Sequence, residues 1–577
     1  MVNQMYLKEL KIRNFRSIKD ITLNFSRGIN ILIGENNAGK TTIIDVLRIC
    51  LGYRDQDGLR VNKNDFHISQ HDETLKPIEF DLSFEKDKDE EIGYFIEMYD
   101  AENDSLDLHF RFSIKQYDKY ERIHSEVWGG KNEGANIPSE VFHSFIQVYL
   151  GALRDAERYL RPGRYNQLGD LIIGLDEENI SEEYTREEMV GEFSDNIEDS
   201  KFSDYIKEVN NQYIAKHLKK MTFEEDTSLN IIPIDQDFEE ISKNLKIKIP
   251  LTKDETNDKY LELYQNGLGQ NNLIYISILL SRLDDLSESD DSLYLSLLIE
   301  EPEAHLQPQL QNLFFSYLNE LNEELNNKKS FQVFITSHSP TITAKADLDS
   351  LIILQRDYEN ENVVCADFKS LSFEEENKEY LQKFLDVTKS QLLFSKRVIF
   401  VEGISEALLV PVFAKKLGYE LENKGVEVVM LNGINFKHFI PLFDEENHLI
   451  FKGSIITDKD RKTLDDDESD TFKKLEENEN ENLKVCGAEK TLEYDLLTCN
   501  PDKSFIREVF KEVHPRIFKN VFNNSEEEIC NIMNESKKSI KKSRIAWILS
   551  TELNNDETIE YYVPEYIDTA LEFVFKK

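Results

Sequence analysis

A short glycine-containing segment restricts the possible folds of this chain more than any other. The run GENNAGKTT, residues 34–42, matches the pattern G-x-x-x-x-G-K-[ST] of a phosphate-binding loop. It follows the largely apolar stretch Ile29–Ile33 and opens an expected helix, Thr41–Cys50, as a strand–loop–helix phosphate site requires. Glycines let backbone N–H groups surround a phosphate, and the helix N-terminus adds a favourable dipole. The segment therefore predicts a nucleotide-binding α/β domain.

The side chains of this loop have separate roles in the predicted ATP site. Lys40 supplies a positive charge to the β- and γ-phosphates, and Thr41 offers its hydroxyl to Mg²⁺. The loop residues predicted to bind the nucleotide are Gly34, Asn36, Asn37, Gly39, Lys40, Thr41 and Thr42. Several classes of ATPase share such a loop. Other motifs in the chain are therefore needed to decide to which class this one belongs.

Two later strand ends supply acidic and imidazole groups of the kind that an ATPase needs. The apolar stretch Leu293–Ile299 ends in EEPE, and we predict that Glu300 holds Mg²⁺ while Glu301 polarises the attacking water. The strand in FQVFITSHSP ends at His338, which we predict contacts the γ-phosphate. Taken alone, a histidine there is more often capped or exposed; its order after the loop and the acidic strand favours the functional interpretation.

A second glycine-containing segment bears on how the ATP site is completed. In NGLGQNNLIYISILL, Gly267 and Gly269 precede an apolar helix whose N-terminus can bind an anion. A chain that carries both this element and a phosphate loop completes its ATP site only across a dimer, so both glycines are predicted to bind nucleotide. An ordinary glycine turn before a core helix remains the alternative.

The order of these motifs resembles the ABC-type ATPases of DNA maintenance, in the branch of RecF and the SMC proteins. The opening LKIRNFRSIKDITLNF is similar to their first strands, and Ala152–Leu160 resembles the segment after their Q-loop. Two departures are plain, because the signature reads NGLGQ rather than LSGGQ and the Walker B acid is Glu300 rather than Asp. The spacing from Lys40 to Gly267 leaves no room for a long coiled-coil arm.

Two strand ends in the C-terminal part carry a second group of acids. VIFVEGISEALLVPVF places Glu402 at the end of an apolar strand and Glu406 in the first turn of the next helix. SIITDKD ends another strand with Asp458 and Asp460. In a chain with 111 Asp and Glu, each acid alone is more often a solvated carboxylate, so the prediction depends on their joint placement. Such oxygen ligands suit Mg²⁺ or Mn²⁺, which can promote phosphodiester cleavage.

A Glu motif followed by a DxD motif resembles the Toprim fold of topoisomerases, primases and small nucleases. The five cysteines form no CxxC pair, whereas primases of this type usually bind zinc through cysteines. An ABC-type ATPase followed by Toprim resembles the OLD (overcoming lysogenization defect) nucleases, which include the nuclease of the Gabija antiphage system. The resemblance implies a catalytic lysine at Lys542, with Lys541 as the alternative. It also implies metal ligands at Glu402, Glu406, Asp458, Asp460 and Glu493.

Charge and hydropathy bear on where in the cell the protein is located and on what it can bind. No run of about 18 uncharged apolar residues occurs, and the N-terminal segment is charged where a signal peptide is apolar, so we expect a cytoplasmic protein without a membrane partner. A net charge of −42 opposes phosphate binding, although basic runs occur at Lys8–Lys19 and Lys537–Arg544. The bulk charge therefore weakens a nucleic-acid partner without excluding it, because a protein can be acidic on average and basic locally.

Together these features predict an α/β chain: an ABC-type (RecF/SMC-like) ATPase domain over residues 1–165 and 250–390, a helical insert for dimerisation over 165–250, and a Toprim domain over 391–577. The resemblance to the OLD nucleases implies an endonuclease that uses ATP and Mg²⁺ or Mn²⁺, cuts DNA in preference to RNA, forms a homodimer or tetramer, and serves antiphage defence. The sequence leaves open whether a helicase or a reverse transcriptase (retron) acts as its partner. The alternatives are a RecF-like DNA clamp with a non-catalytic Toprim domain and a signalling ATPase with a separate effector.

Overall fold

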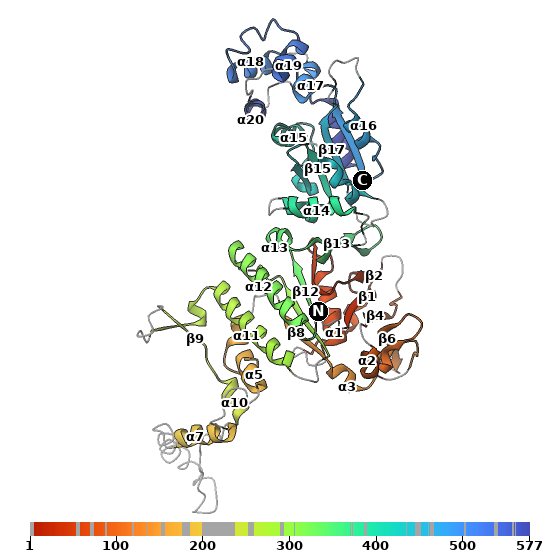
Figure 1. Ribbon diagram of the computed structural model, residues 1–577, viewed down its shortest axis with the longest axis vertical. Helices are drawn as coiled ribbons and strands as arrows, with labels where there is room; N and C mark the ends of the chain where they lie inside the picture. Colours follow the sequence, from red (N-terminus) through yellow and green to blue (C-terminus); the bar gives the residue numbers. More distant parts are fainter. Residues whose placement is uncertain are drawn as a thin grey trace, which may run out of the picture.

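The computed structural model describes residues 5–52, 58–69, 74–86, 89–117, 120–134, 137–151, 156–175, 185–198, 237–251, 259–288, 293–304, 306–369, 371, 373–385, 389–433, 435–444, 452–459, 461, 467–500, 503–535, 541–556, 559 and 561–576. Within these ranges no helix combines the length and apolarity needed to cross a membrane. Figure 1 shows an elongated molecule, with the strands and helices from β1 (Tyr6–Phe15) to α13 (Pro340–Lys345) in one half and those from α15 (Ile404–Lys416) to α21 (Glu565–Phe575) in the other.

A six-stranded sheet carries the phosphate loop. Its order is β14 (Asn362–Asp367), β13 (Leu351–Asp357), β3 (Gly28–Gly34), β12 (Ser330–Ser337), β11 (Tyr294–Glu300) and β8 (Phe145–Leu150). Every neighbouring pair is parallel except β13 and β14. The residues of β3, β11 and β12 are buried throughout, as expected for a sheet covered on both faces. Because these strands are parallel, the loops that follow them meet at one edge of the sheet.

Different elements cover the two faces of this sheet. On one face, helix α1 (Lys40–Leu51) shares an apolar core with a second sheet, which is antiparallel. On the other face pack helices α11 (Leu268–Glu288) and α12 (Pro308–Asn326). The antiparallel sheet consists of β2 (Ile18–Asn24), β1 (Tyr6–Phe15), β4 (Ile78–Glu85), β6 (Ser105–Tyr117) and β5 (Tyr99–Asp100), with β7 (Tyr120–Gly129) on β6. Helix α1 is thereby fixed between two sheets, and the phosphate loop at its N-terminus with it.

Short elements connect β8 to α11. The predicted insert contains helices α5 (Gln167–Gly174), α7 (Arg186–Glu198) and α10 (Phe238–Lys243), and residues 199–236 lie outside the described residues. The Asn166 side-chain amide donates to the backbone oxygens of Lys243 and Leu245, both at 2.9 Å, which ties the start of α5 to the end of α10. A hairpin of β9 (Lys248–Pro250) and β10 (Tyr260–Glu262) follows. The dimerisation role of this insert stays a prediction.

A four-stranded parallel sheet forms the C-terminal half, in the order β16 (Val426–Met430), β15 (Arg397–Val401), β17 (Lys452–Asp458) and β18 (Leu483–Ala488). One face packs on α15 (Ile404–Lys416), α17 (Leu492–Cys499), α18 (Ser504–Val513), α20 (Lys542–Asn555) and α21 (Glu565–Phe575). The other face meets the ATPase half, because Phe400 and Leu392 belong to the same apolar core as α12. One continuous core therefore joins the two halves of the chain.

Candidate nucleotide and metal sites

A pocket of about 440 Å³ lies at the edge of the six-stranded sheet where β3, β11 and β12 end. Arg16 and Ser17, from the turn between β1 and β2, line it although the sequence patterns assigned them no role. The predicted residues that it brings together are Asn36, Asn37, Gly39, Lys40, Thr41, Thr42, Glu301 and His338. The backbone oxygen of the remaining loop residue, Gly34, accepts a hydrogen bond from the Lys40 ammonium group. The phosphate loop, the acidic strand end and the histidine therefore meet, as their order in the sequence indicated.

Lys40 is held inside the phosphate loop. Its ammonium group donates to the backbone oxygens of Gly34 at 2.8 Å and Glu35 at 2.7 Å. Burial lowers the pKa of Lys40 to about 8, against the opposing effect of the nearby carboxylates of Glu301, Glu303 and Glu35. A triphosphate in the pocket would favour the charged form of this lysine, so nucleotide binding and protonation of Lys40 are linked.

Glu300 joins the acidic strand to the loop. One of its carboxylate oxygens accepts from the Thr41 hydroxyl at 2.9 Å, and the other accepts from the Tyr149 hydroxyl at 2.8 Å. Burial raises the pKa of Glu300, and both hydrogen bonds oppose that rise. The Arg48 guanidinium lies 3.7 Å from the centre of the Tyr149 ring. A carboxylate beside the threonine hydroxyl is correctly placed for the predicted Mg²⁺ contact, which stays a prediction.

Glu301 and His338 lie together at the mouth of this pocket. Glu301 has a φ of 45°, a left-handed conformation that is unfavourable for a residue with a side chain and that clusters at functional sites. Its carboxylate lies 3.7 Å from the Nε2 atom of His338. Burial lowers the pKa of His338 and the Lys40 charge adds to this, while Glu301 opposes it. The net lowering favours a neutral imidazole near neutral pH.

Glu303, which the sequence patterns left unassigned, fixes the end of β12. Its carboxylate accepts from the Ser337 hydroxyl at 3.0 Å and from the His338 backbone N–H at 2.5 Å. Burial raises the pKa of Glu303, and these hydrogen bonds counter the rise. The third acid of the EEPE run therefore orients the histidine loop, whereas the second, Glu301, lines the pocket and the first, Glu300, is bonded to Thr41 and Tyr149.

Gly267 and Gly269 lie apart from the residues that line this pocket. Gly267 immediately precedes α11, and Gly269 is in its first turn. Gly267 is exposed, and Leu268 beside it is 49% exposed. Their contact with ATP across a dimer stays a prediction.

The second predicted site forms where neighbouring strands of the C-terminal sheet end. Glu402 follows β15, and Asp458 is the last residue of the adjacent strand β17. The Thr457 hydroxyl donates to the Glu402 carboxylate at 3.0 Å. Glu406, in the first turn of α15, accepts from the Gly403 backbone N–H at 3.1 Å. Glu493 enters from α17, which follows the next strand, β18, so three adjacent parallel strands deliver the acids to one edge.

Burial and the neighbouring acids raise the pKa of two carboxyl groups at this edge. Burial raises the pKa of Asp458 well above its usual range, and the carboxylates of Glu493, Glu406 and Glu402 raise it further. Burial also raises the pKa of Glu406, and Glu493 and Glu402 add to that effect. Carboxylates held close together in a buried site repel one another, so a cation stabilises their charged forms.

Lys542 supplies one such positive charge. Its ammonium group lies 3.2 Å from the Glu493 carboxylate. Burial acts to lower the pKa of Lys542, but Glu493, Asp458 and Glu406 outweigh it and the pKa is raised. Lys541 is exposed, and its backbone N–H donates to the His514 ring at 2.9 Å. Of the two candidate lysines, Lys542 is therefore the one that faces the acids.

The donor set fits a hard divalent cation in charge and in atom type, because it offers only carboxylate oxygens. Within the described part of the chain, however, no three His, Cys, Asp or Glu side chains converge closely enough to hold an ion. Asp460, the second acid of the DxD motif, lies outside the described residues. Binding of an ion would therefore have to draw these carboxylates together.

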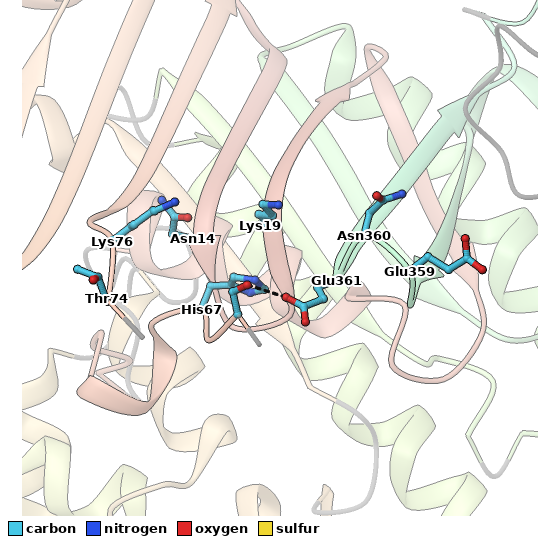
Figure 2. Close-up of a pocket in the computed structure, with 9 residues that line it drawn as sticks. Asn14, Lys19, His67, Thr74, Lys76, Glu359, Asn360 and Glu361 are labelled. Carbon is cyan, nitrogen blue, oxygen red and sulfur yellow. Dashed lines mark hydrogen bonds between the residues drawn. The ribbon is translucent and has the colours of Figure 1, made fainter. Parts of the chain in front are cut away.

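A second pocket, of about 430 Å³, lies beside the turn between β1 and β2 and contains none of the predicted site residues. Figure 2 shows Asn14 and Lys76 on one side of it and Glu359 on the other. The Nδ1 atom of His67 lies 2.8 Å from the Arg16 backbone oxygen, and its buried Nε2 atom has no hydrogen-bond partner among the described residues. The mixture of lysines and glutamates distinguishes this lining from a phosphate site.

Comparison with known families settles the class of the chain. The model described as AAA ATPase domain matches residues 5–126 and 141–343, which is more than half of the chain. The chain belongs to this AAA ATPase domain family. The TOPRIM domain model of the overcoming lysogenization defect protein-like family matches residues 393–460. That second match includes Glu402, Glu406, Asp458 and Asp460 and ends before Glu493 and Lys542.

Curated relatives combine the same two parts. Endonuclease GajA of Bacillus cereus (strain HuB5-5) is 23% identical, with 99% of each chain covered. The OLD nuclease of Thermus scotoductus is 23% identical over 74% of this chain and 77% of its own. The solved C-terminal region of the Xanthomonas campestris pv. campestris OLD protein is 26% identical, covers 32% of this chain and 94% of that one, and has a TM-score of 0.24. The predicted fold class and the predicted likeness to the OLD family are confirmed.

Proposed function

We propose that this chain is an ATP-regulated, divalent-metal-dependent endonuclease that cuts DNA in antiphage defence in the cytoplasm. The observation that supports this most is the placement of Glu402 and Asp458 at the ends of neighbouring strands and of Glu493 in the helix after the next strand, with Lys542 against Glu493. The likeness to relatives named endonuclease GajA and OLD nuclease supports the same class of reaction. The proposed units are the ATPase domain at 1–165 and 250–390, the insert at 165–250 and the Toprim domain at 391–577.

Each side chain of the nuclease centre has a proposed part in phosphodiester cleavage. The carboxylates of Glu402, Glu406, Asp458, Asp460 and Glu493 would hold Mg²⁺ or Mn²⁺. The bound ions supply Lewis acidity at the scissile phosphate. Lys542 would place a fixed positive charge where the phosphate gains negative charge during the reaction. The Thr457 hydroxyl orients Glu402 and would keep its carboxylate turned toward Asp458.

An ion pair supports the proposal that nucleotide controls the nuclease. Lys396, which immediately precedes β15, lies with its ammonium group 3.0 Å from the carboxylate of Glu35 in the phosphate loop. Its backbone oxygen accepts from Lys452 at 2.9 Å, at the first residue of β17. The two strands that end at Glu402 and Asp458 are therefore attached at their beginnings to the nucleotide loop. A homodimer or tetramer would complete the ATP site through Gly267 and Gly269.

Substitution of Asp458 tests the nuclease assignment. Because Asp458 touches the proposed metal site and not the phosphate loop, we expect Asp458→Ala to abolish Mg²⁺-dependent DNA cleavage and to leave ATP turnover unchanged. Glu422→Gln, at an exposed acid of the same half, serves as the matched control and should cleave normally. Unchanged cleavage by Asp458→Ala would remove this site from the reaction.

The same experiment separates the two alternatives. A RecF-like clamp with a non-catalytic Toprim domain would bind DNA and turn over ATP without metal-dependent cleavage in the unsubstituted protein. A signalling ATPase would likewise cut nothing until its separate effector is added. Cleavage by the purified chain alone therefore excludes both.

A further inference from the structure

The helical unit after β18 differs in charge from the rest of the chain. Residues 503–544 contain ten Lys and Arg against six Asp and Glu, whereas the whole chain has a net charge of −42. Several exposed cations in this unit have no carboxylate partner among the residues that the structure describes; they are Lys511, Arg516, Lys519, Lys541 and Arg544. A local excess of unpaired positive charge on an acidic protein marks a surface that suits phosphates.

An exposed tryptophan lies three residues beyond this unit, on the same helix as Arg544. Trp547, on α20, is 55% exposed, whereas Trp128, the second tryptophan of the chain, is 9% exposed. Lys541, Arg544 and Trp547 are spaced by three residues, so they form one stripe along the helix, called here the α20 stripe. Aromatic rings beside cations are the means by which proteins stack on the bases of single strands while holding the backbone.

The α20 stripe begins beside the proposed nuclease centre. Lys542, the first residue of α20, directly follows Lys541 and lies 3.2 Å from Glu493. Trp547 is about 7.5 Å further along the helix axis, from the rise of about 1.5 Å per residue. Successive nucleotides of a stacked strand are about 3.4 Å apart. Five residues also turn an α-helix by about 500°, a net rotation of about 140°, so Trp547 and Lys542 point to different sides of α20 and a bound strand would pass round the helix between them.

We infer that the α20 stripe binds the strand to be cut and that Trp547 stacks on an unpaired base of that strand. This inference rests on the proposed nuclease function and names its substrate class, namely nucleic acid that is single-stranded or locally opened beside the cleavage site. In a closed duplex the base faces are covered by neighbouring bases, so only the phosphates would be available to the stripe. Lys541 and Arg544 hold the backbone on either side.

The fluorescence of the full-length protein reports the stacking directly. Single-stranded DNA is added in EDTA, so that no metal-dependent cleavage occurs, and tryptophan emission is recorded. Because Trp128 is nearly buried, we expect the quenching to come from Trp547. Trp128→Phe should keep the quenching and Trp547→Phe should lose it. Quenching that persists in Trp547→Phe contradicts the assignment.

Binding affinity supplies the second measurement, by anisotropy of a labelled oligonucleotide. Trp547→Ala should weaken binding of single-stranded DNA about five- to hundredfold, the usual effect of removing one stacking ring. Trp547→Phe should retain most of the affinity, and a fully paired duplex should bind both variants as it binds the unsubstituted protein. Tyr120→Ala, at a 73% exposed ring on β7, is the matched control and should change neither.

The possible results separate this inference from the proposed function. An equal loss of single-strand and duplex affinity in Trp547→Ala would mean a contact with the backbone and would overturn stacking. Unchanged single-strand affinity in Trp547→Ala, with cleavage lost only in Asp458→Ala, would refute the α20 stripe and leave the nuclease intact. No cleavage by the unsubstituted chain, together with Trp547-dependent binding, would overturn the proposed function and retain the surface. Normal ATP turnover by each variant verifies that it is folded.

Discussion

Lys40 shows how burial sets the chemistry of a single side chain in this protein. The same ammonium group that the phosphate loop requires is surrounded by protein, and its pKa falls to about 8. Buried carboxylates at the other site shift in the opposite direction, as the raised pKa of Asp458 shows. In both cases the charged form is disfavoured by burial, so each site is stabilised by a partner of opposite charge.

We expect ATP binding to weaken above pH 8. Above that pH the free protein has a largely neutral Lys40, so that ATP binding must take up a proton, and the affinity should fall about tenfold for each further pH unit. Titration with a fluorescent ATP analogue between pH 7 and 9.5 measures this. Lys40→Arg is the control, because arginine keeps its charge and should give a flat, weaker profile. A flat profile for the unsubstituted protein would contradict the role of Lys40.

Glu301→Gln should stop ATP hydrolysis and preserve ATP binding. Glu301 lies in the pocket beside His338, where a carboxylate can accept a proton from the attacking water and an amide cannot. We expect turnover to fall at least about hundredfold, in line with removal of a general base. Steady-state phosphate release and nucleotide titration together check the result. A parallel loss of binding would show that Glu301 has a structural role instead.

The sequence patterns predicted functional residues that belong to a motif of recognisable spacing. They missed functional residues that belong to no such motif. Six of the seven loop residues, Glu301 and His338 line one pocket, and their roles there stay predictions. Tyr149, which bonds Glu300, lies within an ordinary apolar strand, and nothing local distinguishes it. Arg16 reaches the pocket from a turn far from the loop in sequence. Such contacts depend on strand order, which one sequence does not encode locally.

At the scale of elements, the strands that end in functional residues were predictable because they are short, apolar and each followed by a helix or a loop. Strands β3, β11, β12, β15 and β17 lie close to their predicted positions. The order of the sheets was not predictable, since β3 lies between β13 and β12, which come much later in the chain. The second DxD acid, Asp460, cannot be compared, because it lies outside the described residues.

The ion pair between Glu35 and Lys396 should couple the two sites. Because this contact ties the phosphate loop to the start of β15, we expect Lys396→Met to reduce the difference between DNA cleavage with and without ATP. The exchange Glu35→Lys with Lys396→Glu should restore part of that difference. Cleavage rates at fixed Mg²⁺, with and without ATP, measure it. An unchanged response to ATP in Lys396→Met would exclude this pair from regulation.

At the scale of the whole molecule, the two halves share one apolar core instead of meeting at a polar interface. Leu392 and Phe400 from the C-terminal half belong to the same buried cluster as Phe315 and Leu318 of α12. Burial of apolar surface is the main stabilising contribution in folding, so each half contributes to the stability of the other. The halves are therefore expected to unfold together.

Phe400→Ala tests this coupling. The ring is fully buried, so its removal should lower the free energy of unfolding by about 3–5 kcal/mol. If the core is shared, circular dichroism and loss of nucleotide binding should report one transition, shifted to lower temperature by the same amount. Tyr120→Ala, at an exposed ring, should shift neither signal. Two separate transitions, with nucleotide binding unaffected, would show that the halves unfold independently.

The direction in which strand β15 runs bears on whether the protein can cut circular as well as linear DNA. Its first end adjoins the nucleotide loop through Lys396, and its last end carries Glu402, about 20 Å further on at about 3.3 Å per residue. The proposed cutting edge therefore lies at the end of β15 that is remote from the nucleotide loop. A strand would not have to be threaded by its terminus between the subunits, so a covalently closed circle of DNA should be cut as readily as a linear molecule with the same opened region.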